Sequence, residues 1–432
     1  MAFPGAKWLS GSLQVEEDQK KLREEVRFLR STVTDLRSTV TELTKTMREV
    51  EEFIKQKDLA LAIEDNKRRQ MDRKYYEDKN LVYLEGNAGV IGSGIEGTGK
   101  DQFKTPMGIA IYPPYEYSSD FENGLVFVVD RDNHRVQVYG TKPLQHMHTI
   151  GTGIAGNGKD QLNTPKAAVI LLPSVNCSSF PYLGLLYVSD TENKRVQVFN
   201  VETRELHLSI VDDSELYTDG DGDEPWGLAI IQPNKDFPEG LLFIGYRYSI
   251  RVVVRYATSG RYRHEFPVYG DDPGNNEGPR GIAVQMPTSV SPDYLLIVTN
   301  CDPMCASSIH IFNALSGSHL KTIDSNALSG IQLIFGRRNE KKSIFDQPYD
   351  IAVMPANSKY PNGAIYLASH HSQNVAVFDA TTYQLINRNI LDDKLPEAFG
   401  LAVCRDSKEG TDRNVVFVSD ATTNTVQIII DE

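Results

Sequence analysis

The sequence predicts an all-β six-bladed propeller preceded by a long α-helical coiled coil. A repeated phrase occurs six times after Gly92, and a heptad pattern of apolar residues occupies the first part of the chain. The sixth copy of the phrase ends one predicted strand short, so its last strand must come from elsewhere in the chain. We expect four parts: an N-terminal tail over 1–14, a parallel coiled coil over 15–63, a basic helical neck over 64–80 and a propeller over 81–432.

The heptad pattern places apolar residues at alternating steps of four and three. Its positions are Leu22, Val26, Leu29, Val33, Leu36, Val40, Leu43, Met47, Val50 and Ile54. This period is typical of a left-handed coiled coil, and β-branched residues at position a with Leu at d favour a parallel dimer. We therefore expect these residues to form a homodimer interface. A hetero-coiled coil with another protein's helix is one alternative, and a single helix packed on the propeller is another.

The predicted neck is rich in basic and aromatic residues between Asn66 and Tyr76. Such runs can bind phosphate backbones or anionic lipid. Acidic residues, among them Asp65 and Asp72, alternate with the basic ones here. This alternation favours a solvated helix over a nucleic-acid or membrane surface.

Each copy of the repeated phrase contains three short apolar, β-branched runs separated by turn residues. In the clearest copies, IGSGIEGTGKDQFKTPMGIAI precedes GLVFVVDRDNHRVQVYG, and IGTGIAGNGKDQLNTPKAAVI precedes GLLYVSDTENKRVQVFN. Equivalent positions in the six copies are Gly108, Ala167, Gly227, Gly281, Asp350 and Gly400, with spacings of 59, 60, 54, 69 and 50 residues. Runs of this kind predict antiparallel strands, and the period indicates units that bury their apolar faces against their neighbours.

A fourth strand completes each predicted unit. We expect it in the apolar run that follows each copy, at 148–151, 208–211, 265–270, 332–336 and 387–391. Six four-stranded units make a six-bladed propeller. Because the sixth copy ends at Asp431 and Glu432, directly after its third strand, we expect residues 82–92 to pair with residues 425–431 and close the ring. Closure in this way removes the open sheet edge between the first and last blades.

The repeated phrase resembles the NHL repeat. The resemblance rests on Asp130, Asn133, His134, Arg135, Val136, Gln137 and Val138 in the first copy and on Asp190, Asn193, Arg195, Val196, Gln197 and Val198 in the second. It covers most of the chain and implies an NHL-type propeller. The whole is similar to the coiled-coil and NHL part of tripartite-motif NHL proteins, but its four cysteines include no CxxC pair of a RING or B-box module.

The third to fifth copies depart from this pattern, because Gly245, Asn300 and Ser369 replace the expected Asp. These departures argue against a ligand role for the Asp in every blade. We expect a structural role instead, in which the carboxylate accepts hydrogen bonds from backbone amides of the following turn.

The charge of the chain is distributed unevenly. The formal net charge is −13; residues 1–76 carry 16 Lys/Arg against 14 Asp/Glu, which leaves −15 on residues 77–432. An acidic propeller suits a polyanion poorly, because non-specific nucleic-acid binding depends on neutralising phosphates. Some tripartite-motif NHL proteins bind RNA through a basic propeller face, so RNA binding through the neck and the basic loops is the alternative function. The loop residues concerned are Lys100, Lys104, Lys159, Arg337, Arg338, Lys341 and Lys342.

Catalysis is not predicted from the sequence. Six-bladed propellers include lyases and lactonases with a metal in the central channel, which makes such an enzyme the second alternative. None of the nine histidines recurs at innermost-strand positions, and Cys301 and Cys305 would need two further zinc ligands. His370 and His371 are adjacent in a turn, where we expect their side chains to point apart. No phosphate-binding loop, GxSxG or HExxH motif occurs. We therefore predict no enzyme activity, no cofactor and no metal.

We expect a location inside the cell, because no signal peptide or membrane span is recognised and the cysteines show no disulfide pattern. The N-terminal MAFPGAKWLSGS lacks the apolar segment of a signal peptide, and no run approaches the length of a membrane span. Four cysteines without a disulfide pattern suit a reducing compartment. We expect a cytoplasmic protein, with a cytoskeletal or ciliary assembly as one candidate setting.

The predicted function is that of a non-enzymatic scaffold, dimerised by its coiled coil, that presents acidic propellers to other proteins of a larger assembly. Loops on a rigid framework are where binding is usually found. One propeller face gathers the loops between blades and the turns between second and third strands. The candidate contact residues on that face are Arg131, His134, Lys194, Tyr246, Arg247, Tyr248, Arg337, Arg338, His370 and His371.

Overall fold

A computed structural model describes residues 19–42, 44–48, 81–82, 89–113, 124–173, 184–212, 223–268, 278–288, 290–300, 307–325, 344–387, 389–390, 397–406 and 413–431. The chain divides into two compact units, Met1–Lys74 and Tyr75–Glu432. The first unit contributes a helix and the second contributes β-strands.

The helix of the first unit comprises residues 19–42 and 44–48. Its threonines donate their hydroxyl hydrogens to the backbone one turn earlier: Thr32 Oγ1 lies 3.0 Å from Phe28 O, and Thr44 Oγ1 lies 2.7 Å from Val40 O. This local bonding satisfies the hydroxyls within the helix, so β-branched threonines are tolerated in its interior. Among the described residues, no helix has the length and apolarity needed to cross a membrane.

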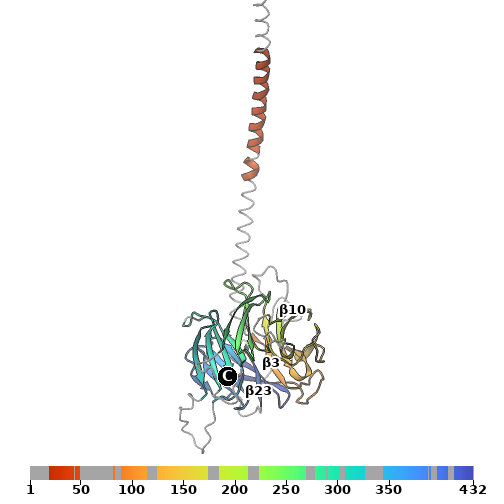
Figure 1. Ribbon diagram of the computed structural model, residues 1–432, viewed down its shortest axis with the longest axis vertical. Helices are drawn as coiled ribbons and strands as arrows, with labels where there is room; N and C mark the ends of the chain where they lie inside the picture. The colour runs from red at the N-terminus through yellow and green to blue at the C-terminus, as the bar shows by residue number, and fades with distance from the viewer. Residues whose placement is uncertain are drawn as a thin grey trace, which may run out of the picture. The chain divides into compact units, whose positions relative to one another are not determined.

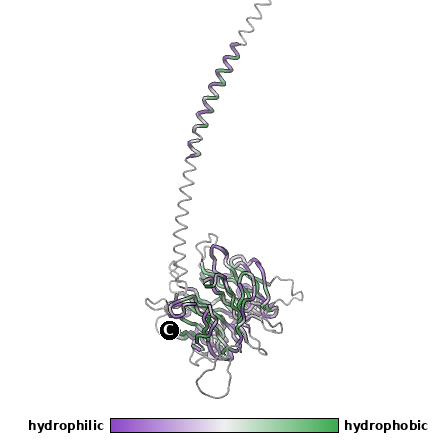
Figure 2. Tube along the Cα trace, turned by 90° about the vertical axis from the view of Figure 1, so that its left-hand side faces the viewer, coloured by the Kyte–Doolittle hydropathy of each residue, from purple (hydrophilic) through white to green (hydrophobic). Residues whose placement is uncertain are grey.

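One stripe of the helix is apolar and exposed. Figure 2 shows hydrophobic residues recurring between hydrophilic ones along the helix. The stripe consists of Leu22, Val26, Leu29, Val33, Leu36, Val40 and Met47, which are 42% to 65% exposed. The predicted interface residues Leu43, Val50 and Ile54, the tail over 1–14 and the whole predicted neck over 64–80 lie outside the described residues. The described helix accounts for 19–42 and 44–48 of the coiled coil expected over 15–63, and the other residues of that range lie outside the described part of the chain.

The second unit contains six sheets, coloured in chain order from orange to blue in Figure 1. One strand of each sheet contacts its counterparts in the two neighbouring sheets, and the contact between β23 and β3 completes the ring. These innermost strands are β3 (Pro106–Tyr112), β7 (Pro165–Leu171), β11 (Pro225–Ile231), β15 (Pro279–Gln285), β19 (Pro348–Met354) and β23 (Ala398–Asp406). A closed ring of six sheets confirms the predicted six-bladed propeller.

The remaining strands follow outward in antiparallel order in each blade. The second strands are β4 (Leu125–Asp130), β8 (Leu185–Asp190), β12 (Leu241–Tyr246), β16 (Leu295–Asn300), β20 (Ala364–Ser369) and β24 (Asn414–Asp420). The third strands are β5 (Arg135–Thr141), β9 (Arg195–Asn200), β13 (Arg251–Tyr256), β17 (Ser308–Asn313), β21 (Asn374–Asp379) and β25 (Thr425–Asp431). The outer strands of the first five blades are β6 (Leu144–Ile150), β10 (Leu206–Val211), β14 (Tyr262–Pro267), β18 (His319–Asp324) and β22 (Leu385–Asn387).

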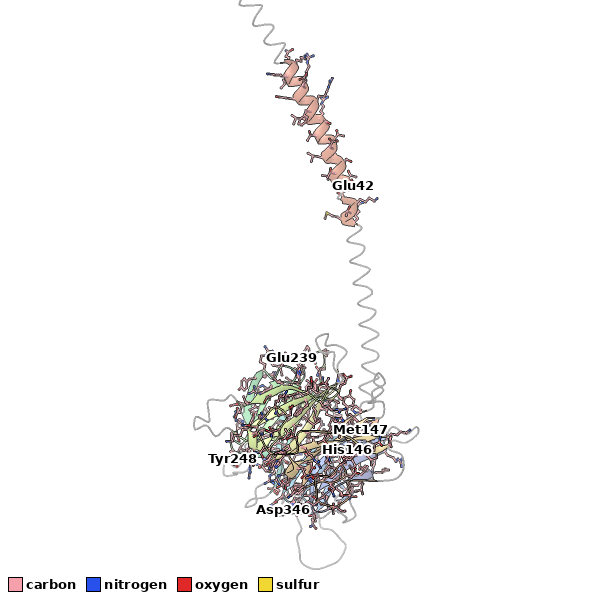
Figure 3. The ribbon with its side chains drawn as sticks, turned by 90° about the vertical axis from the view of Figure 1, so that its right-hand side faces the viewer. Glu42, His146, Met147, Glu239, Tyr248 and Asp346 are labelled. Carbon is pink, nitrogen blue, oxygen red and sulfur yellow. The ribbon has the colours of Figure 1, made fainter. Side chains whose placement is uncertain are left out.

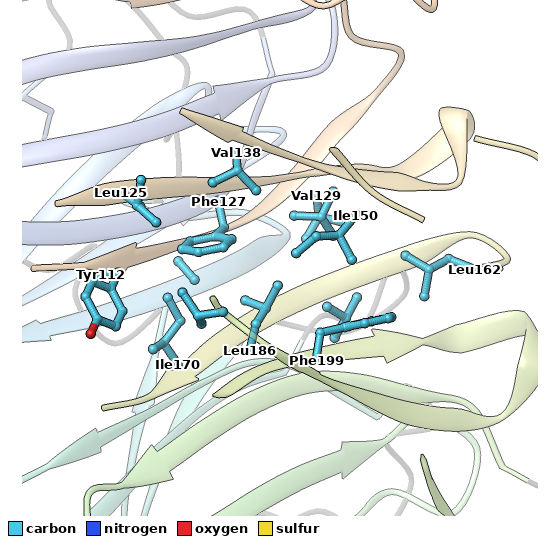
Figure 4. Close-up of a cluster of buried hydrophobic side chains, with 14 of the residues drawn as sticks. Tyr112, Leu125, Phe127, Val129, Val138, Ile150, Leu162, Ile170, Leu186 and Phe199 are labelled. Carbon is cyan, nitrogen blue, oxygen red and sulfur yellow. The ribbon is translucent and has the colours of Figure 1, made fainter. Parts of the chain in front are cut away.

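Burial decreases from the inside of a blade to its outer edge. All six residues of β4 are buried, whereas β6 has exposed residues along most of its length. The second strands are therefore continuous apolar runs, as expected for strands covered on both faces. In Figure 4, Phe127 and Val129 of blade one face Leu186 and Phe199 of blade two, within one buried cluster. The blades are held together by such clusters.

The small residue of the repeated phrase lies where neighbouring innermost strands approach closely. A Cβ atom on Gly400 would lie 2.0 Å from Met107 O, and one on Gly227 would lie 2.3 Å from Arg280 O. No side chain fits at these distances, which explains the glycine. Blade five has Asp350 at this position, and its Oδ2 accepts a hydrogen bond from the Leu401 amide of blade six at 2.8 Å.

The last blade takes its outer strand from the start of the propeller sequence. β2 (Val90–Ile91) pairs antiparallel with β25, with Val90 opposite Gln427 and Ile91 opposite Val426. β1 (Leu81–Val82) instead pairs parallel with the end of β23. Residues 83–88 lie outside the described part of the chain. The described segment before blade one therefore contacts two different strands of blade six, which a single strand over 82–92 would not do.

The C-terminal strand is also tied to blade five. Asp431 accepts hydrogen bonds from the hydroxyls of Tyr360 at 2.9 Å and Tyr366 at 2.6 Å, and it pairs with Lys359 Nζ at 2.6 Å. Asp431 is buried, so these contacts compensate its lost hydration.

The outer strand of blade four differs from the sequence prediction. We expected it at 332–336, but β18 spans His319–Asp324. A short turn with Gly317 at φ 72° connects β17 to β18, so the hairpin forms with the first available run. The additional residues between the fourth and fifth copies follow this strand. In blade five the outer strand, β22, similarly begins at Leu385, before the predicted 387–391.

Candidate functional site

A buried ion pair stabilises the turn after the second strand of blade one. Asp130 is fully buried, and its Oδ2 accepts hydrogen bonds from Arg135 Nε at 2.8 Å and Asn133 Nδ2 at 2.9 Å. The Arg135 guanidinium also donates to the carbonyls of Thr98, Gly99 and Gln102. We call this group of contacts the Asp–Arg clamp. It attaches the loop before β3 to the turn between β4 and β5.

Blade two has the same clamp. Arg195 Nε donates to Asp190 Oδ2 at 2.7 Å, and its other nitrogens donate to the carbonyls of Asn157, Gly158 and Gln161. Asp130 Oδ1 and Asp190 Oδ1 accept the amides of Lys104 and Asn163, respectively. These amides belong to the loop that precedes the blade, whereas we expected amides of the following turn. The Asp residues are engaged in these structural contacts.

In blades three and six a carboxylate also binds backbone amides, but from a different position or at different amides. In blade three Gly245 replaces the Asp, and Asp223 of the preceding loop accepts the amides of Tyr248 and Ser249 at 2.9 Å each. In blade six Asp420 Oδ1 does accept amides of the following turn, from Thr422 at 2.9 Å and Thr423 at 3.2 Å. Each carboxylate therefore attaches loop or turn backbone to its blade.

His134 makes a structural contact between blades. It ends the 3-10 turn η1 (Arg131–Asn133) with φ 50°, and its Nδ1 accepts the Thr164 amide of blade two at 3.1 Å. Asn424 has the same position in blade six and accepts the Thr105 amide at 3.1 Å. Lys194 ends the corresponding turn η2 (Thr191–Asn193) of blade two with φ 55°.

Tyr246 does not lie on the surface, contrary to the sequence prediction. It is the last residue of β12, opposite Pro225 and Arg251, and it is 0% exposed. Burial raises the pKa of its hydroxyl. Tyr246 is thus part of the core, because the strand continues to the residue at which we expected the turn.

Four other candidate residues lie at the same end of the blades, just after the second strands. Tyr248, labelled in Figure 3, is 59% exposed, while the side chain of Arg247 is 31% exposed. His370 is mostly buried and lies 3.4 Å from Glu397, and the exposed His371 lies 3.7 Å from Asp346. The two histidine rings do not diverge as expected, since their centroids are 5.0 Å apart. Arg337 and Arg338 lie outside the described residues.

Several of these side chains meet residues that the sequence analysis did not select. In every blade the first residue of the innermost strand pairs with the last residue of the second strand. The second residue of the innermost strand therefore has an equivalent place in all six blades. An irregularity in pairing follows in every blade, and such bulges redirect side chains. We define the inner-strand cluster as Lys166, Trp226, Arg280, Tyr349 and Phe399 from this position, together with Arg247 and His370.

Three basic groups surround one indole ring in this cluster. Lys166 Nζ lies 4.0 Å from the centre of a Trp226 ring, and the guanidinium carbons of Arg247 and Arg280 each lie 4.8 Å from it. Arg280 also lies 4.3 Å from the centre of the Tyr349 ring. Cation–π attraction partly compensates for the proximity of three positive charges.

The other side of the cluster is aromatic. The rings of Tyr349 and Phe399 meet edge to face with centroids 4.5 Å apart, and His370 lies 4.9 Å from Phe399. Burial is the main cause that lowers the pKa of His370; Glu397 opposes this effect. The imidazole is therefore mainly neutral at pH 7, and its ring packs against Tyr349 and Phe399.

Lys166 has an unfavourable electrostatic environment. Burial, together with the charges of Arg131, Arg247 and Arg280, lowers the pKa of its ammonium group from 10.5 to about 8, against an opposing effect of Glu224. Glu224 is also engaged with Arg247 at 3.7 Å and accepts a hydrogen bond from the Tyr248 hydroxyl at 3.3 Å. Among the described residues, Glu224 therefore pairs with Arg247, and Lys166 has no ion pair.

Aligning the six copies of the repeated phrase shows a sequence pattern that identifies these residues. The position after the proline, or after Ala398 in the last copy, is Met107, Lys166, Trp226, Arg280, Tyr349 and Phe399. The preceding residue is Pro in five of the six copies and the following residue is Gly in four, whereas this position varies between apolar, charged and aromatic types. Because equivalent positions of a closed repeat meet at its axis, these residues could have been grouped from the sequence.

The other predicted sites have limited structural support. Lys104, one of the basic loop residues, pairs with Glu96 at 3.1 Å. Within the described ranges, no group of three His, Cys, Asp or Glu residues could hold a metal ion. Cys404 is buried, with its Sγ 3.8 Å from Val415 O, and Cys301 and Cys305 lie outside those ranges.

Comparisons with known proteins give no assignment for the chain. No family model matches it, and no curated protein matches it. Among solved structures, Sqt1 of Saccharomyces cerevisiae has a TM-score of 0.44 at 10% identity, over 72% of this chain and 82% of that one. The hydrazine synthase of Kuenenia stuttgartiensis has a TM-score of 0.40 at 13% identity, over 75% of this chain and 80% of that one. The propeller assignment therefore rests on the six sheets and their closed ring.

Proposed function

We propose that this chain is a non-enzymatic protein-interaction scaffold that binds its partners through the propeller face containing the inner-strand cluster. The observation that carries the proposal is the convergence of Trp226, Tyr349, Arg247 and Arg280 at one end of the innermost strands. Tryptophan, tyrosine and arginine are the residue types that most often dominate binding energy at protein interfaces. Trp226 and Arg280 are 6% and 8% exposed, so they support the accessible contacts of this face, which include Arg247 and the exposed Tyr248.

The proposal includes a homodimer formed by the N-terminal helix. Its exposed apolar stripe has the heptad spacing of a two-stranded coiled coil. Burying such side chains contributes roughly 1.5–3 kcal/mol for each fully buried Leu or Val. A dimer presents two propellers, and so gains avidity for a repetitive or polymeric assembly in the cytoplasm.

The proposal also assigns the propeller to the NHL type. The Asp–Arg clamps of blades one and two give the Asp, Asn and Arg of the repeated phrase a common structural role. This shared network supports homology among the blades better than the apolar periodicity alone, because it uses specific side chains at fixed positions.

Affinity capture with matched variants tests the scaffold. Full-length protein is immobilised and incubated with native extract, with and without nuclease. One variant carries Arg247→Ala and Tyr248→Ala; its control carries Arg261→Ala and Tyr262→Ala, an adjacent Arg–Tyr pair in the same blade with exposed side chains. We expect discrete proteins that survive nuclease, are lost with the first variant and are kept by the control.

Other outcomes would contradict parts of the proposal. Loss of the proteins after nuclease, with RNA in the untreated sample, would favour the RNA-binding alternative. Equal recovery by both variants would place the contact surface elsewhere. A stoichiometric metal found by elemental analysis, together with lyase or lactonase activity, would favour the enzyme alternative.

A further inference from the structure

The inner-strand cluster contains a buried ammonium group without a carboxylate partner. Lys166 is 9% exposed, and among the described residues its contact is with the ring of Trp226, 4.0 Å away. No described carboxylate lies within ion-pair distance of Lys166 Nζ, since Glu224 is paired with Arg247. A buried charge normally has a counter-ion. The arrangement is therefore suited to an anion supplied by a ligand.

We propose that the inner-strand cluster binds a single carboxylate of an acidic peptide segment, with that carboxylate at Lys166 and the neighbouring apolar side chains of the peptide against the partly exposed Tyr349 and Phe399. This inference rests on the proposed function and specifies the chemistry of the partner. The carboxylate would supply the counter-ion that Lys166 lacks among the described residues, next to two guanidinium groups on the same indole.

Charge distribution favours a peptide over a polyanion. Residues 77–432 carry a net charge of −15, and Glu224 and Glu397 lie next to the cluster residues Arg247 and His370. A nucleic-acid backbone would place several phosphates against these carboxylates, whereas an isolated Asp or Glu places one charge at the cationic centre. The aromatic side of the cluster supplies contacts that phosphate groups cannot use.

The proposal predicts a specific pH dependence. Lys166 must be protonated to bind the carboxylate, and the pKa of its ammonium in the free protein is about 8. The groups that face it are Arg131, Arg247 and Arg280, which disfavour its charge, and Glu224, which favours it. A bound carboxylate raises the pKa of Lys166. Affinity should therefore fall by up to tenfold per pH unit above pH 8, until the pKa of the complex is reached.

The test uses the full-length protein and a library of randomised heptapeptides displayed on phage. We expect the enriched peptides to share an Asp or Glu next to apolar residues. A resynthesised peptide should bind at least tenfold more weakly when that Glu is replaced by Gln, and Lys166→Met should weaken the original peptide by a similar factor. Lys166→Arg should retain binding at pH 9, where the wild-type protein has lost much of it, because a guanidinium stays charged.

Thermal melting serves as the control that each variant is folded. Lys166→Met removes a buried charge that its neighbours repel, so this variant should melt at no lower temperature than the wild-type protein. Enrichment of peptides without a carboxylate, or equal binding by Lys166→Met, would overturn the inference. Displacement of the peptide by a single-stranded RNA decamer with steep salt dependence would overturn it in favour of nucleic acid, and displacement by millimolar inorganic phosphate would show an unspecific anion site. If partners captured from extract are retained by Lys166→Met, the inference fails while the scaffold stands.

Discussion

The Asp–Arg clamp of blade one allows a quantitative test of its structural role. The perturbation is Arg135→Met, which keeps an extended side chain but removes the guanidinium. In the native protein this group pairs with the fully buried Asp130 at 2.8 Å and donates to three backbone carbonyls of the loop before β3. Its removal leaves Asp130 with the Lys104 amide and the Asn133 side chain as hydrogen-bond donors.

The expected loss is large because both side chains are buried, at 9% and 0% exposure. Removing one partner of a buried pair costs roughly 3–5 kcal/mol. With an unfolding entropy of about 2.1 cal/mol/K per residue, a propeller of about 350 residues loses about 1.4 °C in Tm per kcal/mol. Arg135→Met should therefore lower Tm by roughly 4–7 °C.

Scanning calorimetry of the full-length protein measures this effect against a matched control. Arg261→Met removes a pair with Glu239 whose side chains are 66% and 33% exposed, at a distance of 3.4 Å. Surface pairs contribute about 0–1 kcal/mol, so the control should shift Tm by about 1 °C or less. The double variant with Asp130→Asn should lose less than the sum of the single variants, because no buried charge is left unpaired. Equal Tm values for Arg135→Met and Arg261→Met would refute a structural role for the clamp.

Four further predictions concern closure, assembly and pH. Gly400→Ala should lower Tm by several degrees because its Cβ would lie 2.0 Å from Met107 O, whereas Gly89→Ala, with its nearest atoms at 3.8 Å, should melt like the wild-type protein; equal melting would contradict the close approach. Deleting residues 426–432 removes the strand that pairs with β2 and the anchor at Asp431, so calorimetry should show no cooperative transition, and an unchanged melt would refute this closure. Leu29→Glu with Leu36→Glu should convert a dimer into a monomer by light scattering, while Phe28→Glu, on an exposed residue outside the heptad positions, should not. Burial raises the pKa of Asp350 to about 7, so the folded protein retains a proton that the unfolded chain releases above pH 4; stability should fall as pH rises from about 4 to 7, and Asp350→Asn should stabilise the protein more at pH 8 than at pH 5, with a pH-independent difference arguing against this.

Much of the fold could be predicted because its determinants are local. Apolar, β-branched runs separated by turns predict strands wherever they occur, and their repetition predicts the number of blades. The exceptions are also instructive. The outer strand of blade four is β18, because β17 forms a hairpin with the next run along the chain and not with the more apolar run at 332–336. Tyr246 is buried because β12 continues to that residue, which the alternation of residue types did not reveal.

The sequence by itself determined the six repeated units, the need for a strand from elsewhere to complete the last one, and the heptad spacing of the helix, since each depends on periodicity along the chain. The tertiary structure decided which side chains meet. Lys166, Trp226, Arg280 and Tyr349 are separated by 54 to 69 residues and come together because closing the ring brings equivalent ends of the innermost strands to one place. The same closure places the neighbouring glycines against the next strand's backbone, so proximity within the inner-strand cluster is a property of the ring as a whole.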